Sequence, residues 1–124
     1  MSRHMDSRSA IEAFTALAQP TRLKVFRQLV KAHPGQIAAG EIARNCNVPH
    51  NTMSEHLAVL TRSGLAAARR DGRMMYYCVD LDGFRALVSF LMRDCCNDRA
   101  EICAPLLEEF NNCFTSKKQE KVRA

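Results

Sequence analysis

The 124-residue sequence has no tryptophan, only five glycines and four prolines, and little aromatic content. No apolar run approaches the roughly 18 residues that a membrane-spanning helix needs. The first residues, MSRHMDSRS, lack the apolar centre of a signal peptide. A composition of 47% apolar and 25% charged residues excludes a disordered chain. We therefore expect one cytoplasmic domain whose six cysteines are thiols rather than disulfides.

Positive charge is concentrated in the middle of the chain. The formal net charge is +5, but residues 22–73 hold nine basic and three acidic side chains. Residues 80–110 hold three arginines and seven acids, so their balance is acidic. The basic segment is typical of a surface that meets nucleic acid, and charge alone leaves a solvated basic face as the alternative.

Apolar residues at helical spacing predict five helices. One helix is expected before Pro20, one from Pro20 to the HPGQ stretch, and three over residues 38–45, 50–63 and 81–95, with a further helical turn in ICAPLLEEF. The residues expected on their inner faces are, in chain order, Ile11, Phe14, Leu17 and Ala18; Leu23, Phe26, Leu29 and Val30; Ile42 and Cys46; Met53, Leu57 and Leu60; and Phe84, Leu87, Val88 and Leu91.

Turn residues separate these helices and predict one hairpin. Asn47-Val48-Pro49 predicts a tight turn, and Gly64 predicts a left-handed cap after the fourth helix. Asp71-Gly72 lies between two strand-compatible runs and predicts the turn of a β-hairpin. Two short helices followed by a hairpin with a basic tip indicate a mainly α-helical winged helix-turn-helix, with a generic helical core beside a solvated hairpin as the alternative. We expect a flexible N-terminus over 1–9, the domain over 10–110 and a flexible basic tail over 111–124.

In this fold the second short helix enters the major groove of DNA. Its face opposite the apolar residues carries short hydrogen-bonding tips, and the residues expected to read base edges are His50, Asn51, Ser54 and Glu55. His56, on the flank of that helix, is expected to be structural or to contact a phosphate. The other residues expected to contact the DNA backbone, or in the hairpin the minor groove, are Thr52, Arg62, Arg69, Arg70 and Arg73.

Three segments of the chain carry a family pattern: ALAQPTRLKVFRQLV, GEIARNCNVPHNTMSEHLAVLTRSGL and RRDGRMMYYCVD. Together they resemble the ArsR/SmtB family of bacterial metal-responsive repressors, and the resemblance covers roughly Ala10 to Leu91. The combination of A-x-P-T-R-L, S-x-H-L-x-x-L and G-R-x-x-Y is specific for this family among winged helices. The resemblance implies a homodimer, built by the first and last long helices, that blocks transcription and leaves DNA when it binds an inducer.

The inducer has to be inferred from the cysteines, because two ligand sets of this family are missing. Only Cys46 stands where some members carry a C-V-C-D-L cluster, and no histidine follows His56 to form an Asp and His site on the last helix. The chain instead has Cys95, Cys96 and Cys103 in RDCCNDRAEICAPL. Three thiols without a nearby histidine suit As(III), which prefers three sulfurs in a pyramid, whereas zinc favours a fourth ligand. This stretch also resembles the C-terminal arsenic-binding segment of one subgroup of arsenic-responsive repressors.

The sequence thus predicts an arsenic-responsive repressor with operator DNA and a second copy of the chain as partners. It predicts no organic cofactor and no membrane partner. An enzyme is not expected, since the chain has no C-x-x-C, no glycine-rich loop after a strand and no histidine near the cysteine cluster. Antimony, bismuth, cadmium or lead as inducer, thiol oxidation, and cysteines as core fillers stay open. Cys113 could complete a four-sulfur site, and Cys46 and Cys78 are expected to be structural.

Overall fold

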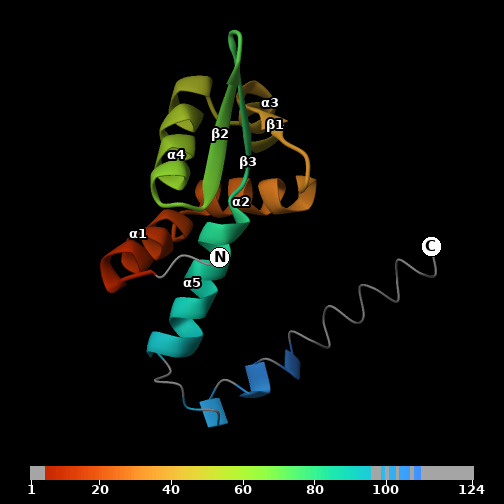
Figure 1. The fold of residues 1–124 in the computed structure, drawn as a ribbon. Coiled ribbons are helices and arrows are strands. Elements are labelled where there is room, and N and C mark those ends of the chain that lie inside the picture. The colour runs from red at the N-terminus through yellow and green to blue at the C-terminus, as the bar shows by residue number, and fades with distance from the viewer. Residues whose placement is uncertain (1–4, 96–98, 100, 103, 107, 110–124) are drawn as a thin grey trace, which may run out of the picture. The chain divides into compact units, whose positions relative to one another are not determined.

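The computed structural model describes residues 5–95, 99, 101–102, 104–106 and 108–109 (Figure 1). The chain divides into two compact units, Met1–Val88 and Ser89–Ala124. The elements, in order, are α1 (Ser7–Leu17), α2 (Pro20–Ala32), β1 (Ile37–Ala38), α3 (Ala39–Cys46), α4 (His50–Arg62), β2 (Ala66–Asp71), β3 (Met74–Val79) and α5 (Leu81–Phe90). In the part of the chain that the structure describes, no helix is both long and apolar enough to cross a membrane. The predicted winged helix-turn-helix is confirmed.

Side chains preceding the first two helices cap them. The Asp6 carboxylate accepts a hydrogen bond from the Ser9 backbone N–H at 2.8 Å, so α1 begins before the domain boundary expected at residue 10. That bond lowers the pKa of Asp6 below its ordinary value of 3.8, because it favours the ionised carboxylate. Gln19 caps α2 in the same way, and Pro20 occupies the first turn, where its missing N–H costs nothing.

The buried face of α1 differs from the one that the sequence predicted. Ala10, Ala13 and Ala16 are at most 1% exposed, whereas Ile11 is 63% and Phe14 37% exposed. Alanines have short side chains, so this face of α1 can pack closely against α2 and α4, which both contact it. The expectation that Ile11 and Phe14 face the core of the chain was wrong.

Similar corrections apply to α2 and α5. Val25, Phe26 and Leu29 form the buried stripe of α2, while the expected core residues Leu23 and Val30 are exposed. In α5 the buried residues are Gly83, Ala86 and Leu87. Phe84 is partly exposed, and its ring lies 5.6 Å from the ring of Phe26. The regular α-helix ends at Phe90, before the expected end at Cys95, and a π-helical turn continues over Leu91–Cys95.

The turn between α3 and α4 has the predicted residues and a defined geometry. Asn47 adopts the left-handed conformation with φ 55°. Its backbone N–H donates to the Arg44 carbonyl at 3.1 Å, and the Val48 N–H donates to the Ala43 carbonyl at 3.1 Å. This pair of bonds is a Schellman motif, which satisfies the last carbonyls of α3 and turns the chain toward α4.

The sheet has three antiparallel strands in the order β1-β3-β2. The two-residue strand β1, too short for the sequence to reveal, pairs Ile37 with Tyr77 and Ala38 with Tyr76. Asp71 pairs with Met74, so the hairpin turn is Gly72-Arg73 and not the predicted Asp71-Gly72. Gly72 has φ 63° and Arg73 has no positive φ, which is the pattern of a type II′ turn. Figure 1 shows this hairpin projecting beyond the helices.

Candidate nucleic-acid interface

Helix α4 has two chemically distinct faces, as predicted. Met53, Leu57 and Leu60 are at most 1% exposed and anchor the helix in the core. The residues of the opposite face that the sequence assigned to DNA are all exposed: His50, Asn51, Thr52, Ser54 and Glu55. Because the apolar side holds α4 in place, its polar side is presented to solvent with side chains that can donate to and accept from base edges.

The beginning of α4 is open to an anion. Pro49 is its N-cap residue and makes no side-chain cap, and the first turn carries no acidic residue. The first backbone N–H groups of a helix have no partner inside the helix, and the helix dipole favours negative charge there. Ser54 donates its hydroxyl proton to the His50 carbonyl at 3.0 Å, so toward DNA its oxygen is left as an acceptor.

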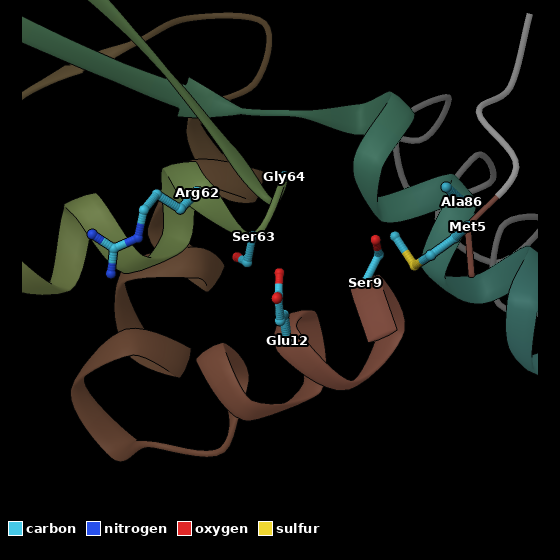
Figure 2. A pocket seen from close by; sticks show the side chains of 7 residues that line it. All are labelled: Met5, Ser9, Glu12, Arg62, Ser63, Gly64 and Ala86. Atoms are coloured by element: carbon cyan, nitrogen blue, oxygen red, sulfur yellow. The ribbon is translucent and has the colours of Figure 1, made fainter. Parts of the chain in front are cut away.

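Arg62, at the other end of α4, lies beside a pocket. The pocket has a volume of about 160 Å³ and is lined by Met5, Ser9, Glu12, Arg62, Ser63, Gly64 and Ala86. Figure 2 shows the Glu12 carboxylate directed toward Ser63, while the Arg62 side chain extends away from both. The exposed guanidinium of Arg62 therefore stays available for the phosphate contact that the sequence predicted.

The three arginines of the hairpin are not equivalent. Arg69 donates to the Gln36 side chain at 3.2 Å, lies 3.8 Å from the Asp71 carboxylate, and places its guanidinium carbon 5.2 Å from the centre of the Tyr76 ring. Arg70 donates to the Gly72 carbonyl at 3.3 Å across the turn. Among the residues described, Arg73 has no side-chain hydrogen bond, ion pair or ring contact. The turn thus presents one free guanidinium, that of Arg73, at its tip.

His56 and Arg22 make a contact that the sequence did not predict. The Arg22 Nη1 lies 3.3 Å from the His56 Nδ1, and the Arg22 Nε donates to the Ala16 carbonyl at 2.7 Å. Both side chains are half-buried. The A-x-P-T-R-L motif contained Arg22, but no local pattern could pair it with a residue 34 positions away.

The described cysteines are isolated from one another. Cys46 ends α3 and its Sγ accepts from the Gln28 side chain at 3.2 Å, and Cys78 is half-buried in β3. No group of three potential metal ligands occurs in the described residues. Cys96 and Cys103 lie outside the described residues. The backbone of Cys95 ends the π-helical turn, but its side chain also lies outside them.

Comparison with known proteins places this arrangement in a family. A helix-turn-helix domain family matches residues 17–67. The HTH-type transcriptional regulator Rv2034 of Mycobacterium tuberculosis is 38% identical over 86 residues, which cover 69% of this chain and 78% of that protein. A homodimeric winged helix-turn-helix domain from Mycobacterium bovis, described as a possible ArsR-family regulator, has a TM-score of 0.57 at 26% identity and covers 74% of this chain and 88% of that one. The chain belongs to the ArsR family of transcriptional regulators.

Another similar solved structure is that of a possible transcriptional regulator for arsenical resistance. It is 30% identical to the chain, with a TM-score of 0.58, and the match covers 64% of this chain and 80% of that one. The relatives named here are regulators or possible regulators of transcription, which confirms the expectation that the chain is not an enzyme. The exposed face of α4 and the free arginine of the hairpin are therefore parts of a DNA-binding protein.

Proposed function

We propose that the chain is an arsenic-responsive repressor that binds operator DNA as a homodimer in the cytoplasm and is released when As(III) binds Cys95, Cys96 and Cys103. The observation that carries the DNA-binding part is the exposed polar face of α4 above a fully buried apolar face. The free guanidinium of Arg73 supports it, since it suits the phosphate backbone.

The dimer is supported by apolar side chains that the chain leaves exposed. Ile11 and Phe14 on α1 and Phe84 on α5 are each at least 37% exposed, and a second copy of the chain could cover them. The related domain from Mycobacterium bovis is homodimeric. A dimer with two-fold symmetry would read two half-sites one helical turn apart.

The inducer site is supported by donor chemistry. Arsenite enters as As(OH)₃; each of three thiols forms one As–S bond and gives its proton to a leaving hydroxide, so three waters depart and no electron is transferred. The cysteine-rich segment 95–103 supplies three such thiols within nine residues. The π-helical turn Leu91–Cys95 leads directly into it, and such turns are frequent at functional sites.

A hundredfold loss of operator affinity needs about 2.7 kcal/mol of coupling free energy between the inducer site and the DNA-binding surface, which is ordinary for allostery.

The test is release from an operator selected by the protein from a pool of random duplexes. We expect arsenite to release the wild-type protein and excess dithiol to reverse the release. Cys95→Ser, Cys96→Ser and Cys103→Ser should each abolish the response and leave binding in the absence of arsenite unchanged. Cys46→Ser and Cys78→Ser are the matched controls, and both should respond like the wild type.

Other inducers give distinguishable results. Antimonite should act on the same three thiols, whereas release by cadmium, lead or bismuth that requires Cys113 would indicate a four-sulfur site. Release by peroxide and not by arsenite would establish thiol oxidation instead. If all three serine variants at 95, 96 and 103 still left the operator with arsenite, the assigned site would be wrong.

A further inference from the structure

We infer that Arg22 is a positioning residue for DNA binding: it holds His56 as a neutral imidazole with its proton on Nε2, so that α4 offers a fixed N–H donor to a DNA phosphate. The inference rests on the DNA-binding role proposed for α4. It concerns one tautomer of one histidine, which can be measured in the protein without DNA.

Arg22 is held in place from two sides before it reaches His56. Its backbone N–H donates to the Gln19 side chain at 2.7 Å at the start of α2. Its Nε donates to the Ala16 carbonyl at 2.7 Å in the last turn of α1. A half-buried guanidinium fixed in this way has little freedom, and its Nη1 lies 3.3 Å from the His56 Nδ1.

The chemistry of the two groups determines which nitrogen carries the proton. An arginine side chain has only donors and keeps its charge at every relevant pH. The atom that faces it must therefore accept, so the Nδ1 of His56 must present a lone pair. A neutral imidazole has one N–H, which leaves the proton on Nε2.

A donor on Nε2 suits a phosphate better than a base edge. His56 is half-buried on the flank of α4, beside the exposed residues Thr52 and Glu55. The arginine that donates to Nδ1 polarises the ring and strengthens its other N–H as a donor, because hydrogen bonds in a chain reinforce one another. A donor of this kind pairs well with an anionic phosphate oxygen, a contact that sets the register of a helix in the groove and carries no sequence information.

The contact also joins three helices. Arg22 lies in the first turn of α2, and its side chain contacts the last turn of α1 at the Ala16 carbonyl and the middle of α4 at His56. Neither Arg22 nor His56 belongs to the buried apolar core. Loss of Arg22 should therefore change the tautomer of the His56 ring while the fold is kept.

The first test is the tautomer of His56 in the free protein, read from long-range proton–nitrogen correlation spectra. The wild type should show the proton on Nε2, and Arg22→Gln should shift the population toward Nδ1. Arg27→Gln is the matched control: it removes the same charge from an exposed position of the same helix and should leave the tautomer unchanged. Arg22→Lys keeps the charge but has one nitrogen in place of the guanidinium fork, so it cannot donate to the Ala16 carbonyl and to the His56 Nδ1 as Arg22 does. It replaces Arg22→Gln if thermal unfolding shows that Arg22→Gln is not folded, and the same shift toward Nδ1 is expected.

The second test is the affinity for a mixed-sequence DNA duplex that is long enough to cover two half-sites. It is measured by fluorescence anisotropy. Arg22→Gln should weaken binding about tenfold more than Arg27→Gln, the effect of losing a hydrogen bond to a charged group. His56→Gln keeps an amide N–H₂ near the position of Nε2 and needs no partner at Nδ1. In that background, Arg22→Gln should cost no more than Arg27→Gln.

Three results would overturn the inference. One is a wild-type spectrum with the proton on Nδ1, another is equal loss of affinity in Arg22→Gln and Arg27→Gln, and the third is an undiminished effect of Arg22→Gln in the His56→Gln background. If the wild-type protein failed to bind any duplex, the proposed function would fail, while the spectra would still decide the tautomer.

Discussion

The unequal hairpin arginines lead to a prediction about salt dependence. Arg73 has no side-chain partner among the described residues, whereas Arg69 is engaged by Gln36, Asp71 and Tyr76. Only a guanidinium free to meet the backbone replaces a condensed counterion on DNA. We therefore expect Arg73→Gln to reduce the salt dependence of DNA binding and expect removal of Arg69 to leave it nearly unchanged.

The expected size follows from the number of phosphates neutralised. Each contact contributes about 0.9 to the slope of log affinity against log salt concentration, so one Arg73 from each protomer of a dimer contributes about 1.8. Between about 50 and 200 mM salt, the wild type should lose about twelvefold more affinity than Arg73→Gln.

The control for Arg69 has to conserve charge. In the wild type the Arg69 guanidinium lies 3.8 Å from the Asp71 carboxylate. Arg69→Gln alone removes this cation, so the carboxylate becomes a repulsive group near DNA. The double variant Arg69→Gln with Asp71→Asn removes the arginine and keeps the net charge. Its salt slope, from anisotropy titrations at several salt concentrations, should match the wild type. If it fell as far as the slope of Arg73→Gln, the distinction drawn between the two arginines would be refuted.

Two further predictions concern stability. Leu57→Ala removes a fully buried side chain of α4 and should lower the free energy of unfolding by about 2–5 kcal/mol in urea titrations, whereas Ser54→Ala on the opposite face should change it by about 0.5 kcal/mol or less. Asp6→Ala should lower the melting temperature at neutral pH, and Asp6→Asn, which keeps the acceptor, should lower it less. Because the pKa of Asp6 is depressed, its contribution is present above 3.8 and disappears as the pH falls through the lower value of the folded state, so the wild type and Asp6→Ala should converge in acid. Melting temperatures that stayed parallel down to low pH would contradict the role of the carboxylate.

Much of the DNA-binding part could be predicted from local patterns. The spacing of Met53, Leu57 and Leu60 determines which face of α4 is buried, because a helix repeats every 3.6 residues. Gly64, with φ 82°, and the turn at Asn47 follow from the residues that tolerate left-handed backbone. These features depend on neighbours in sequence, which is why the winged helix-turn-helix was found without a structure.

What could not be predicted depends on distant partners. Helix α1 has two stripes at helical spacing, one of alanines and one with Ile11 and Phe14, and only the packing against α2 and α4 decides which is buried. The hairpin turn was misplaced by one residue because a glycine can occupy either central position of a tight turn. The contact between Arg22 and His56 connects helices that no local pattern relates.

The short strand β1 has a mechanical consequence. It pairs with β3 of the hairpin, and α3 begins at the very next residue, Ala39. No flexible linker therefore separates the strand that pairs with the hairpin from the first helix of the helix-turn-helix. The Arg69–Gln36 hydrogen bond makes a second tie between the hairpin and the segment before β1. Tilting the hairpin by itself would break the backbone hydrogen bonds between β1 and β3, so the hairpin and the helix-turn-helix should move together as one rigid unit. In the proposed homodimer, an inducer would then act by changing the distance between two such units rather than the shape of either one.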